Sequence, residues 1–197
     1  MGVSPSVGVS IGTREEHGMR WIDLSRPIYS GMPAYPGDPE VSIEVAHTYA
    51  EHTWELRRMT LGTHAGTHVD APSHMHPGAA SLDELPVERF CGKARVVRAD
   101  APDEWPPNRG LFFAETAGIE CAARLKELAP PFVGGGLSEE LERALLGHGI
   151  ITFTDLVELE RIPPGVDFMF FGFPLRIAGG DGSPVRAVAL LEEEGER

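Results

Sequence analysis

Residues 64–74 read His-Ala-Gly-Thr-His-Val-Asp-Ala-Pro-Ser-His, and this stretch says more about the chain than any other. Four of the eight histidines fall between positions 64 and 76. Imidazole and carboxylate groups packed this closely are typical of a bound divalent metal ion with a proton-transfer group beside it. The alternative without a function is a polar strand with scattered surface histidines. It does not account for the aspartate, glycine and proline that are spaced among them.

An extended backbone through residues 64–70 would place His64, Gly66, His68 and Asp70 on one face, because side chains alternate along a strand. Four strand residues span about 13 Å, which is at the limit for two imidazoles that share one ion. We therefore expect a bend or bulge at Gly66, where glycine tolerates unusual backbone dihedrals. Gly66 also carries no side chain that could block an ion.

The candidate metal ligands are therefore His64, His68 and Asp70. Two imidazoles and a carboxylate suit Zn²⁺, with Mn²⁺ or Fe²⁺ as alternatives. Three protein ligands leave one position for water or substrate, and water bound there becomes a nucleophile near neutral pH. Pro72 predicts a turn that returns His74 to the site, where it is the candidate catalytic acid or base. His76, slightly further along, is interpreted as loop surface.

Composition indicates the broad class of protein. A chain of 197 residues and 21.4 kDa fits one domain. Its net charge of −13 argues against nucleic acid or an anionic membrane as a partner. No apolar run approaches 18 residues, so no membrane span is expected. Cys91 and Cys121 form no CxxC pair and indicate buried thiols in a reducing compartment, which favours the cytoplasm.

Three segments are predicted along the chain. Residues 1–19 are rich in glycine and serine and lack the basic start and apolar block of a signal peptide, so we expect a flexible leader. Residues 20–191 are expected to form the single domain. Residues 192–197, with four glutamates among six positions, are expected to be a frayed acidic tail.

Local patterns predict many strands and few helices, hence an α/β or α+β domain. The prolines between positions 27 and 39 predict an extended loop. A strand over residues 56–69 is expected to be interrupted at its glycines. Further strands are predicted at residues 21–24, 41–45, 94–99, 111–113, 132–133, 150–154, 168–171 and 185–191. Helical segments are predicted at 119–128, from the Ser138 cap to Gly147, after Ser81 and at 156–159, with a turn at 179–184.

The motif resembles that of the cyclase family of metal-dependent hydrolases, which includes bacterial kynurenine formamidase. The family pattern H-x-G-T-H-x-D-x-P-x-H is matched at seven positions of residues 64–74. Residues 23–25 with 33–38 resemble the family's opening, and residues 174–187 resemble its closing hairpin. The likeness spans roughly residues 20–191 and implies a swivelling β/β/α fold, a mixed sheet or barrel-like β core with a few flanking helices.

The resemblance also implies roles for particular residues. It implies metal ligation by His64, His68 and Asp70, with His74 as the acid/base and Tyr35 near the substrate pocket. It implies a homodimer or homotetramer that acts on a small molecule.

The chain departs from the family pattern on one side of the expected site. Members with two metal ions take a late histidine and a glutamate, whose places here are held by Glu142 and Thr154. Glu142 can still ligate or support a ligand, whereas Thr154 is a poor ligand and Asp155 is expected to point the other way. Residues 134–136 are Gly-Gly-Gly where a Gly-x-Asp segment is expected, and the stretch from Asp70 to Glu142 is short. We therefore expect one ion per chain.

Three functions fit this pattern. The favoured one is hydrolysis of an amide, formamide, cyclic imide or lactone by metal-activated water, with metal ligands His64, His68, Asp70 and Glu142 and with His74 moving the proton. The alternative is a metal-dependent lyase, dehydratase or cyclase of secondary metabolism on the same scaffold. The third is a binding protein that has lost turnover, against which the retention of His74 argues.

Overall fold

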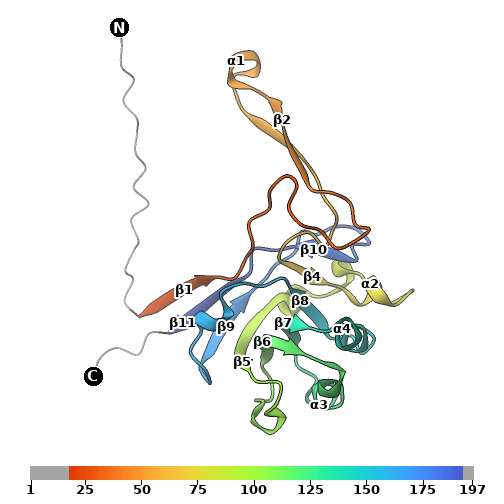
Figure 1. The fold of residues 1–197 in the computed structure, drawn as a ribbon, viewed down its shortest axis with the longest axis vertical. Helices are drawn as coiled ribbons and strands as arrows, with labels where there is room; N and C mark the ends of the chain where they lie inside the picture. The colour runs from red at the N-terminus through yellow and green to blue at the C-terminus, as the bar shows by residue number, and fades with distance from the viewer. Residues whose placement is uncertain (1–17, 193–197) are drawn as a thin grey trace.

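The computed structural model describes residues 18–192, which form a mixed α/β fold built on one curled nine-stranded sheet (Figure 1). The strand order is β1-β11-β9-β5-β6-β7-β8-β4-β10, and the central strands β5 to β8 run parallel. Their neighbours on both sides pair antiparallel, so the sheet is mixed, as the sequence predicts. The strands are β1 Met19–Asp23, β4 His68–Asp70, β5 Cys91–Val97, β6 Gly110–Ala117, β7 Phe132–Leu137, β8 Ile151–Thr154, β9 Asp167–Phe171, β10 Gly182–Pro184 and β11 Val188–Glu192.

Two apolar cores cover the two faces of the sheet. Alternation along β6 sends Phe112 into one core and its neighbours Leu111 and Phe113 into the other. The first core is rich in aromatic rings and includes Phe153 and Phe170, whose ring centroids lie 4.8 Å apart. The second core lies under two helices, α3 Ala122–Leu128 and α4 Glu139–Leu146. These apolar contacts are the main source of stability for the sheet.

Helix α4 begins and ends where the sequence predicts. The Ser138 side chain accepts a hydrogen bond from the Leu141 backbone N–H at 3.3 Å, and Gly147 caps the other end. The other short helices are α1 Tyr49–His52, α2 Pro72–Met75, η1 Leu82–Glu84, η2 Val87–Phe90, η3 Pro102–Glu104, η4 Ile119–Cys121 and η5 Leu159–Arg161. The capping box predicted at Ser81 is confirmed at η1, whereas the helical turn predicted at 156–159 lies at η5 instead. Among residues 18–192, no helix is both long and apolar enough to cross a bilayer.

The glycine run at residues 134–136 lies within β7, although the sequence predicts a strand that ends at residue 133. A Cβ at Gly134 would lie 2.5 Å from Phe112 Cε1, and one at Gly135 would collide with the Phe113 carbonyl. Gly135 also has a φ of +97°, which glycine adopts without strain. The glycines therefore allow β7 to pair closely with β6, and the predicted boundary was wrong because the packing partner is distant in sequence.

A two-stranded arm projects from the body of the protein (Figure 1). It consists of β2 Ser42–His47 and β3 Leu56–Thr60, paired antiparallel, with α1 between them. None of its residues is buried, and it exposes large apolar side chains, namely Val45, Tyr49, Trp54, Leu56 and Met59. The predicted interruption of the 56–69 strand is confirmed, and it separates β3 from β4, which belongs to the large sheet.

The two ends of the described chain meet in the sheet. Met19 in β1 pairs with Glu192 in β11, although the sequence assigns these residues to the leader and the acidic tail. Residues 1–17 and 193–197, which make up the rest of both segments, lie outside the described residues. The turn predicted at 179–184 holds only in part, because Gly182–Pro184 form β10 and pair with β4.

Candidate metal centre

The site is built on the short strand β4, which lies between β8 and β10. His68 is paired with Thr154, and Asp70 with Thr152, across the β4–β8 ladder. Directly opposed residues place their side chains on the same face of a sheet, so two threonine hydroxyls lie beside the imidazole and the carboxylate. The Asp70 side chain is buried, as are Thr152 and His68.

The predicted bend at Gly66 is confirmed. Its φ is +65°, and a Cβ there would lie 3.2 Å from Ile28 Cγ1. The bend turns His64 back toward the strand, so that its Nδ1 lies 2.6 Å from Asp70 Oδ1. His68 Nε2 lies 3.4 Å from the same oxygen. One carboxylate oxygen therefore faces two imidazole nitrogens that come from both sides of the bend.

The other nitrogen of each imidazole has a defined partner. His68 Nδ1–H donates to the Gly66 carbonyl at 2.6 Å, which leaves Nε2 directed at Asp70 and at Thr154 Oγ1, 2.8 Å away. His64 Nε2 donates to Asp181 Oδ2 at 3.0 Å. Partners of this kind fix which ring nitrogen is free to bind a metal ion.

His74 joins the cluster from helix α2, where Pro72 occupies the first turn. The ring centroids of His74 and His64 lie 3.8 Å apart. One donor atom each from His64, Asp70 and His74 lies within 4.8 Å of the others, close enough to surround one ion. The His74 side chain is 31% exposed, so it lies at the mouth of the cluster.

His76 does not join this cluster. Its Nε2–H donates to the Arg143 carbonyl at 2.8 Å and thereby connects the end of α2 to α4. A Cβ at Gly147 would lie 2.9 Å from the same ring, so the ring packs against the end of α4. His76 therefore has a structural contact away from the candidate ligands.

Glu142 approaches Asp70 from helix α4. Its Oε1 accepts a hydrogen bond from Thr152 Oγ1 at 2.8 Å, and the same hydroxyl lies 3.2 Å from Asp70 Oδ2. Burial and the negative charge of Asp70 raise the pKa of Glu142 to about 7. Thr154 Oγ1 lies 3.4 Å from Asp70 Oδ2, so two hydroxyls and one carboxyl occupy this side of the aspartate.

The charges of the cluster are strongly coupled. Burial opposes the ionisation of Asp70, but hydrogen bonds from His64 and His68 hold its pKa well below the usual range. Burial also opposes the protonation of His64, yet its bonds to Asp70 and Asp181 raise its pKa to about 9. A positive charge between these groups is therefore strongly favoured by the surrounding carboxylates.

Sequence reasoning missed Asp181, which it treated only as part of a turn. Asp181 Oδ1 accepts from Thr63 Oγ1 at 2.9 Å, and Oδ2 lies 3.5 Å from His74 Nδ1. Burial opposes its ionisation, but the hydrogen bonds from His64 and Thr63 lower its pKa. The signal that could have indicated it is a carboxylate within the glycine-rich part of residues 174–187, the closing hairpin of the family pattern.

Other candidate residues lie elsewhere. Asp155 faces Arg26 at 3.7 Å, which agrees with the expectation that it points away from the cluster. Tyr35 is 70% exposed in the proline-rich loop.

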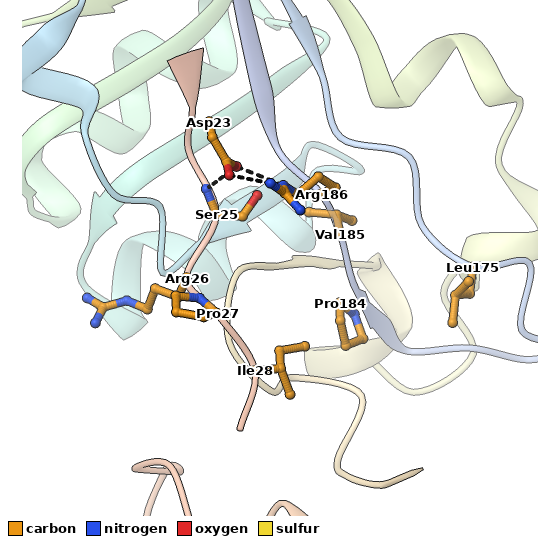
Figure 2. Close-up of a pocket in the computed structure, with 9 residues that line it drawn as sticks. All are labelled: Asp23, Ser25, Arg26, Pro27, Ile28, Leu175, Pro184, Val185 and Arg186. Atoms are coloured by element: carbon orange, nitrogen blue, oxygen red, sulfur yellow. Dashed lines mark hydrogen bonds and ion pairs between the residues drawn. The ribbon is translucent and has the colours of Figure 1, made fainter. Parts of the chain in front are cut away.

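A pocket of about 540 Å³ is lined by residues that follow β1 and by residues 184–186 at the end of β10 (Figure 2). Pro184 in its wall pairs with His68, and Ile28 in its wall lies against Gly66. An ion pair between Asp23 and Arg186 supplies polar groups at one end of the pocket. None of the clustered imidazoles lines this pocket, so it is a neighbour of the candidate centre rather than part of it.

The curled mixed sheet and its His–Asp–His cluster, which is centred on the buried Asp70, define an α/β protein with a site suited to a divalent cation. The chain belongs to the Cyclase family, whose model, described as "Putative cyclase", matches residues 22–128. A kynurenine formamidase of Salinibacter ruber is 32% identical over 216 residues, covering 86% of this chain and 97% of the relative.

Solved structures show the same fold at lower identity. Isatin hydrolase A from Labrenzia aggregata, bound to benzyl benzoate, superposes with a TM-score of 0.75 at 20% identity, covering 89% of this chain and 94% of that one. A structure described as a potential metal-dependent hydrolase with cyclase activity gives a TM-score of 0.71 at 22% identity, covering 89% and 100%. The predicted fold class and family are thereby confirmed.

Proposed function

We propose that this protein is a metal-dependent hydrolase that cleaves an amide-type C–N bond of a small molecule. The observation that carries the proposal is the cluster around Asp70 Oδ1, which lies 2.6 Å from His64 Nδ1 and 3.4 Å from His68 Nε2. His74 lies beside His64 in the same cluster. Family relatives named kynurenine formamidase and a structural neighbour named isatin hydrolase support hydrolysis. They do not favour the lyase, dehydratase or cyclase alternative.

The residues fit a divalent cation. Asp70 is buried, and its Oδ1 lies 2.6 Å from His64 Nδ1, so this buried carboxylate needs a positive partner, either the protonated imidazole or a metal ion that replaces its proton. The Gly66 carbonyl accepts from His68 Nδ1–H and Asp181 accepts from His64 Nε2–H, so the remaining nitrogen of each ring faces Asp70 Oδ1. Imidazole and carboxylate donors together suit Zn²⁺ best, with Mn²⁺ or Fe²⁺ as alternatives.

The proposed ligands are His64, His68 and Asp70. A divalent ion bound there would supply a Lewis acid and lower the pKa of a coordinated water. His74 is exposed enough to meet a substrate and lies beside His64, so we assign it the proton transfer between water and leaving group. The threonines behind Asp70 hold its carboxylate in place through Oδ2.

We propose one ion per chain. Thr154 offers a hydroxyl where the family pattern has a glutamate, and a neutral hydroxyl is a weak ligand. Glu142 bonds to Thr152 and lies next to Asp70, which makes it a fourth ligand or a partner of Asp70. Ion content per chain, measured by plasma emission after dialysis, checks the stoichiometry, and a value near two would contradict it.

The activity itself can be tested with compounds that the relatives' names suggest. Protein loaded with Zn²⁺ or Mn²⁺ is incubated with N-formylkynurenine, isatin, other formamides, cyclic imides and lactones. We expect ring opening or formate release from at least one of them, with one ¹⁸O atom incorporated from labelled water. Silence on all of these compounds at full metal loading would contradict the proposal, and product without solvent label would indicate elimination.

We also propose that the protein is a homodimer or homotetramer in the cytoplasm. A two-stranded ribbon without a third strand is marginally stable, yet the arm exposes Trp54 and Met59, which a second copy could cover. Both cysteines are free thiols, as in a reducing compartment. Light scattering coupled to size exclusion tests the assembly, and a monomer at micromolar concentration would contradict it.

A further inference from the structure

One carboxylate touches both the His64 and the His74 imidazole. Asp181 Oδ2 accepts from His64 Nε2 at 3.0 Å and lies 3.5 Å from His74 Nδ1. The other oxygen of Asp181 accepts from Thr63 Oγ1 at 2.9 Å. One oxygen of Asp181 therefore faces the two imidazoles, and the other binds the loop that carries His64.

The chemistry of imidazole gives this contact a specific consequence. A neutral ring binds a metal ion through one nitrogen and donates N–H from the other, and the acceptor of that N–H determines which nitrogen is free. In His64, Nε2 faces Asp181 while Nδ1 faces Asp70. An ion held by Nδ1 and Asp70 would replace the proton on Nδ1, and Asp181 would then keep the remaining proton on Nε2.

The backbone around Asp181 is fixed relative to the proposed ligands. Its carbonyl accepts from the Ala71 N–H at 2.8 Å, and the next residue, Gly182, pairs with Asp70 in the β10–β4 ladder. A Cβ at Gly182 would collide with the His64 ring, so the ring lies directly against this backbone. Asp83 accepts from the Gly179 N–H at 2.9 Å and anchors the same segment without touching either imidazole.

We propose that Asp181 is a positioning residue for the metal centre. It holds His64 in the tautomer that offers Nδ1 to the ion, and it keeps the His74 ring beside that of His64. The inference rests on the proposed function, because it assumes an ion bound at His64. It adds a residue that lies 117 positions from His64 in the sequence.

The test compares Zn²⁺ affinity, measured by competition with a chromophoric chelator, in the wild type and three variants. We expect Asp181→Ala to weaken the affinity 10- to 100-fold, which is the usual effect of removing the hydrogen-bond partner of a metal-bound histidine. Thr63→Val removes the loop contact but keeps the imidazole contacts, and Asp83→Ala removes the hydrogen bond that anchors the segment at Gly179. Both controls should stay within about three-fold of wild type, because neither changes the acceptor of His64 Nε2–H.

A spectroscopic measurement shows whether Asp181 sets the protonated nitrogen of His64 or only stabilises the surrounding fold. Long-range ¹⁵N–¹H spectra of the zinc-loaded wild type should show His64 protonated at Nε2, and this signature should be lost or mixed in Asp181→Ala. Should that variant fail to fold, Asp181→Asn keeps the size of the side chain, and we expect a smaller loss of affinity in the same direction.

The outcomes separate the two proposals. Wild-type affinity in a folded Asp181 variant would overturn the positioning role, as would equal losses in Asp181→Ala and Thr63→Val. A wild-type protein that binds no divalent ion would instead overturn the proposed function.

Discussion

The two oxygens of the Asp70 carboxylate face different surroundings. Oδ1 lies 2.6 Å from His64 Nδ1 and 3.4 Å from His68 Nε2. Oδ2 lies 3.2 Å from Thr152 Oγ1 and 3.4 Å from Thr154 Oγ1. The imidazoles can share a cation with the carboxylate, whereas the hydroxyls offer only dipoles. The comparison suggests that one oxygen serves the ion and the other holds the side chain in place.

Glu142 adds a second carboxyl to the hydroxyl side. Burial and the charge of Asp70 raise its pKa to about 7, so a substantial fraction is neutral near neutral pH. A neutral carboxyl can donate a hydrogen bond to Asp70, and the hydroxyl of Thr152 lies between the two groups. We call the residues around Asp70 Oδ1 the imidazole side and those around Oδ2 the hydroxyl side. Substitutions on the imidazole side should abolish binding of the ion, whereas those on the hydroxyl side should only weaken its binding.

The largest loss of zinc affinity is expected for Asp70→Asn. Structural zinc sites supply about 10–16 kcal/mol shared among about four ligands, so loss of one ligand should lower affinity by roughly 10³-fold and abolish turnover. Isothermal titration with Zn²⁺ measures the affinity. Asp155→Asn is the matched control, because that carboxylate faces Arg26 instead. Retention of tight zinc binding by Asp70→Asn would show that the ion does not use this carboxylate.

The next largest effect, a loss of turnover without loss of the ion, is expected for His74→Ala. Removal of a general acid or base lowers kcat by about 10²–10⁴-fold, and the ion should remain because the three proposed ligands are intact. Steady-state kinetics and ion content measured on the same preparation check both expectations. His76→Ala is the control, since that ring contacts the Arg143 carbonyl. Full turnover in His74→Ala would remove His74 from the chemistry.

The imidazole side could be predicted from sequence because its parts are local. His64, His68 and Asp70 lie within seven consecutive residues, and the Gly66 bend follows from their spacing and from the freedom of glycine. His74 follows through the turn at Pro72. Short-range geometry therefore fixes most of the proposed ligand set.

The rest of the candidate site depends on strand pairing, which the local sequence pattern does not reveal. Asp181 reaches His64 because β10 pairs with β4, whereas the sequence at this position indicates only a turn. Thr152 was not selected from the sequence, although it is paired with Asp70 across β8. The strand predicted at 132–133 extends through the glycine run of β7, and the local sequence does not show this because the rings that the glycines accommodate, such as Phe112, lie on another strand.

On the hydroxyl side, Glu142→Gln should reduce zinc affinity by about 10-fold if Glu142 supports Asp70 without binding the ion. Glutamine keeps an oxygen that can accept from Thr152, so the fold should be retained. Chelator competition measures the change, and Glu139→Gln, an exposed position on the same helix, is the control. A loss near 10³-fold would assign Glu142 as a fourth ligand.

The smallest effects on zinc binding are expected for the threonines. Thr152→Val removes a fully buried hydroxyl that bonds to both Asp70 and Glu142, which should lower the free energy of unfolding by about 1–3 kcal/mol in the metal-free protein. Thr154→Val should destabilise less, because its hydroxyl is only partly buried, and valine keeps the shape at both positions. Urea unfolding followed by circular dichroism measures both variants. Both should keep zinc affinity within about 10-fold of wild type, because a neutral hydroxyl acts on the ion only through Asp70 or, for Thr154, also through His68, whose Nε2 lies 2.8 Å from it. A greater loss of zinc in either variant would mean that the hydroxyl side takes part directly in binding, and the division between the two oxygens of Asp70 would no longer hold.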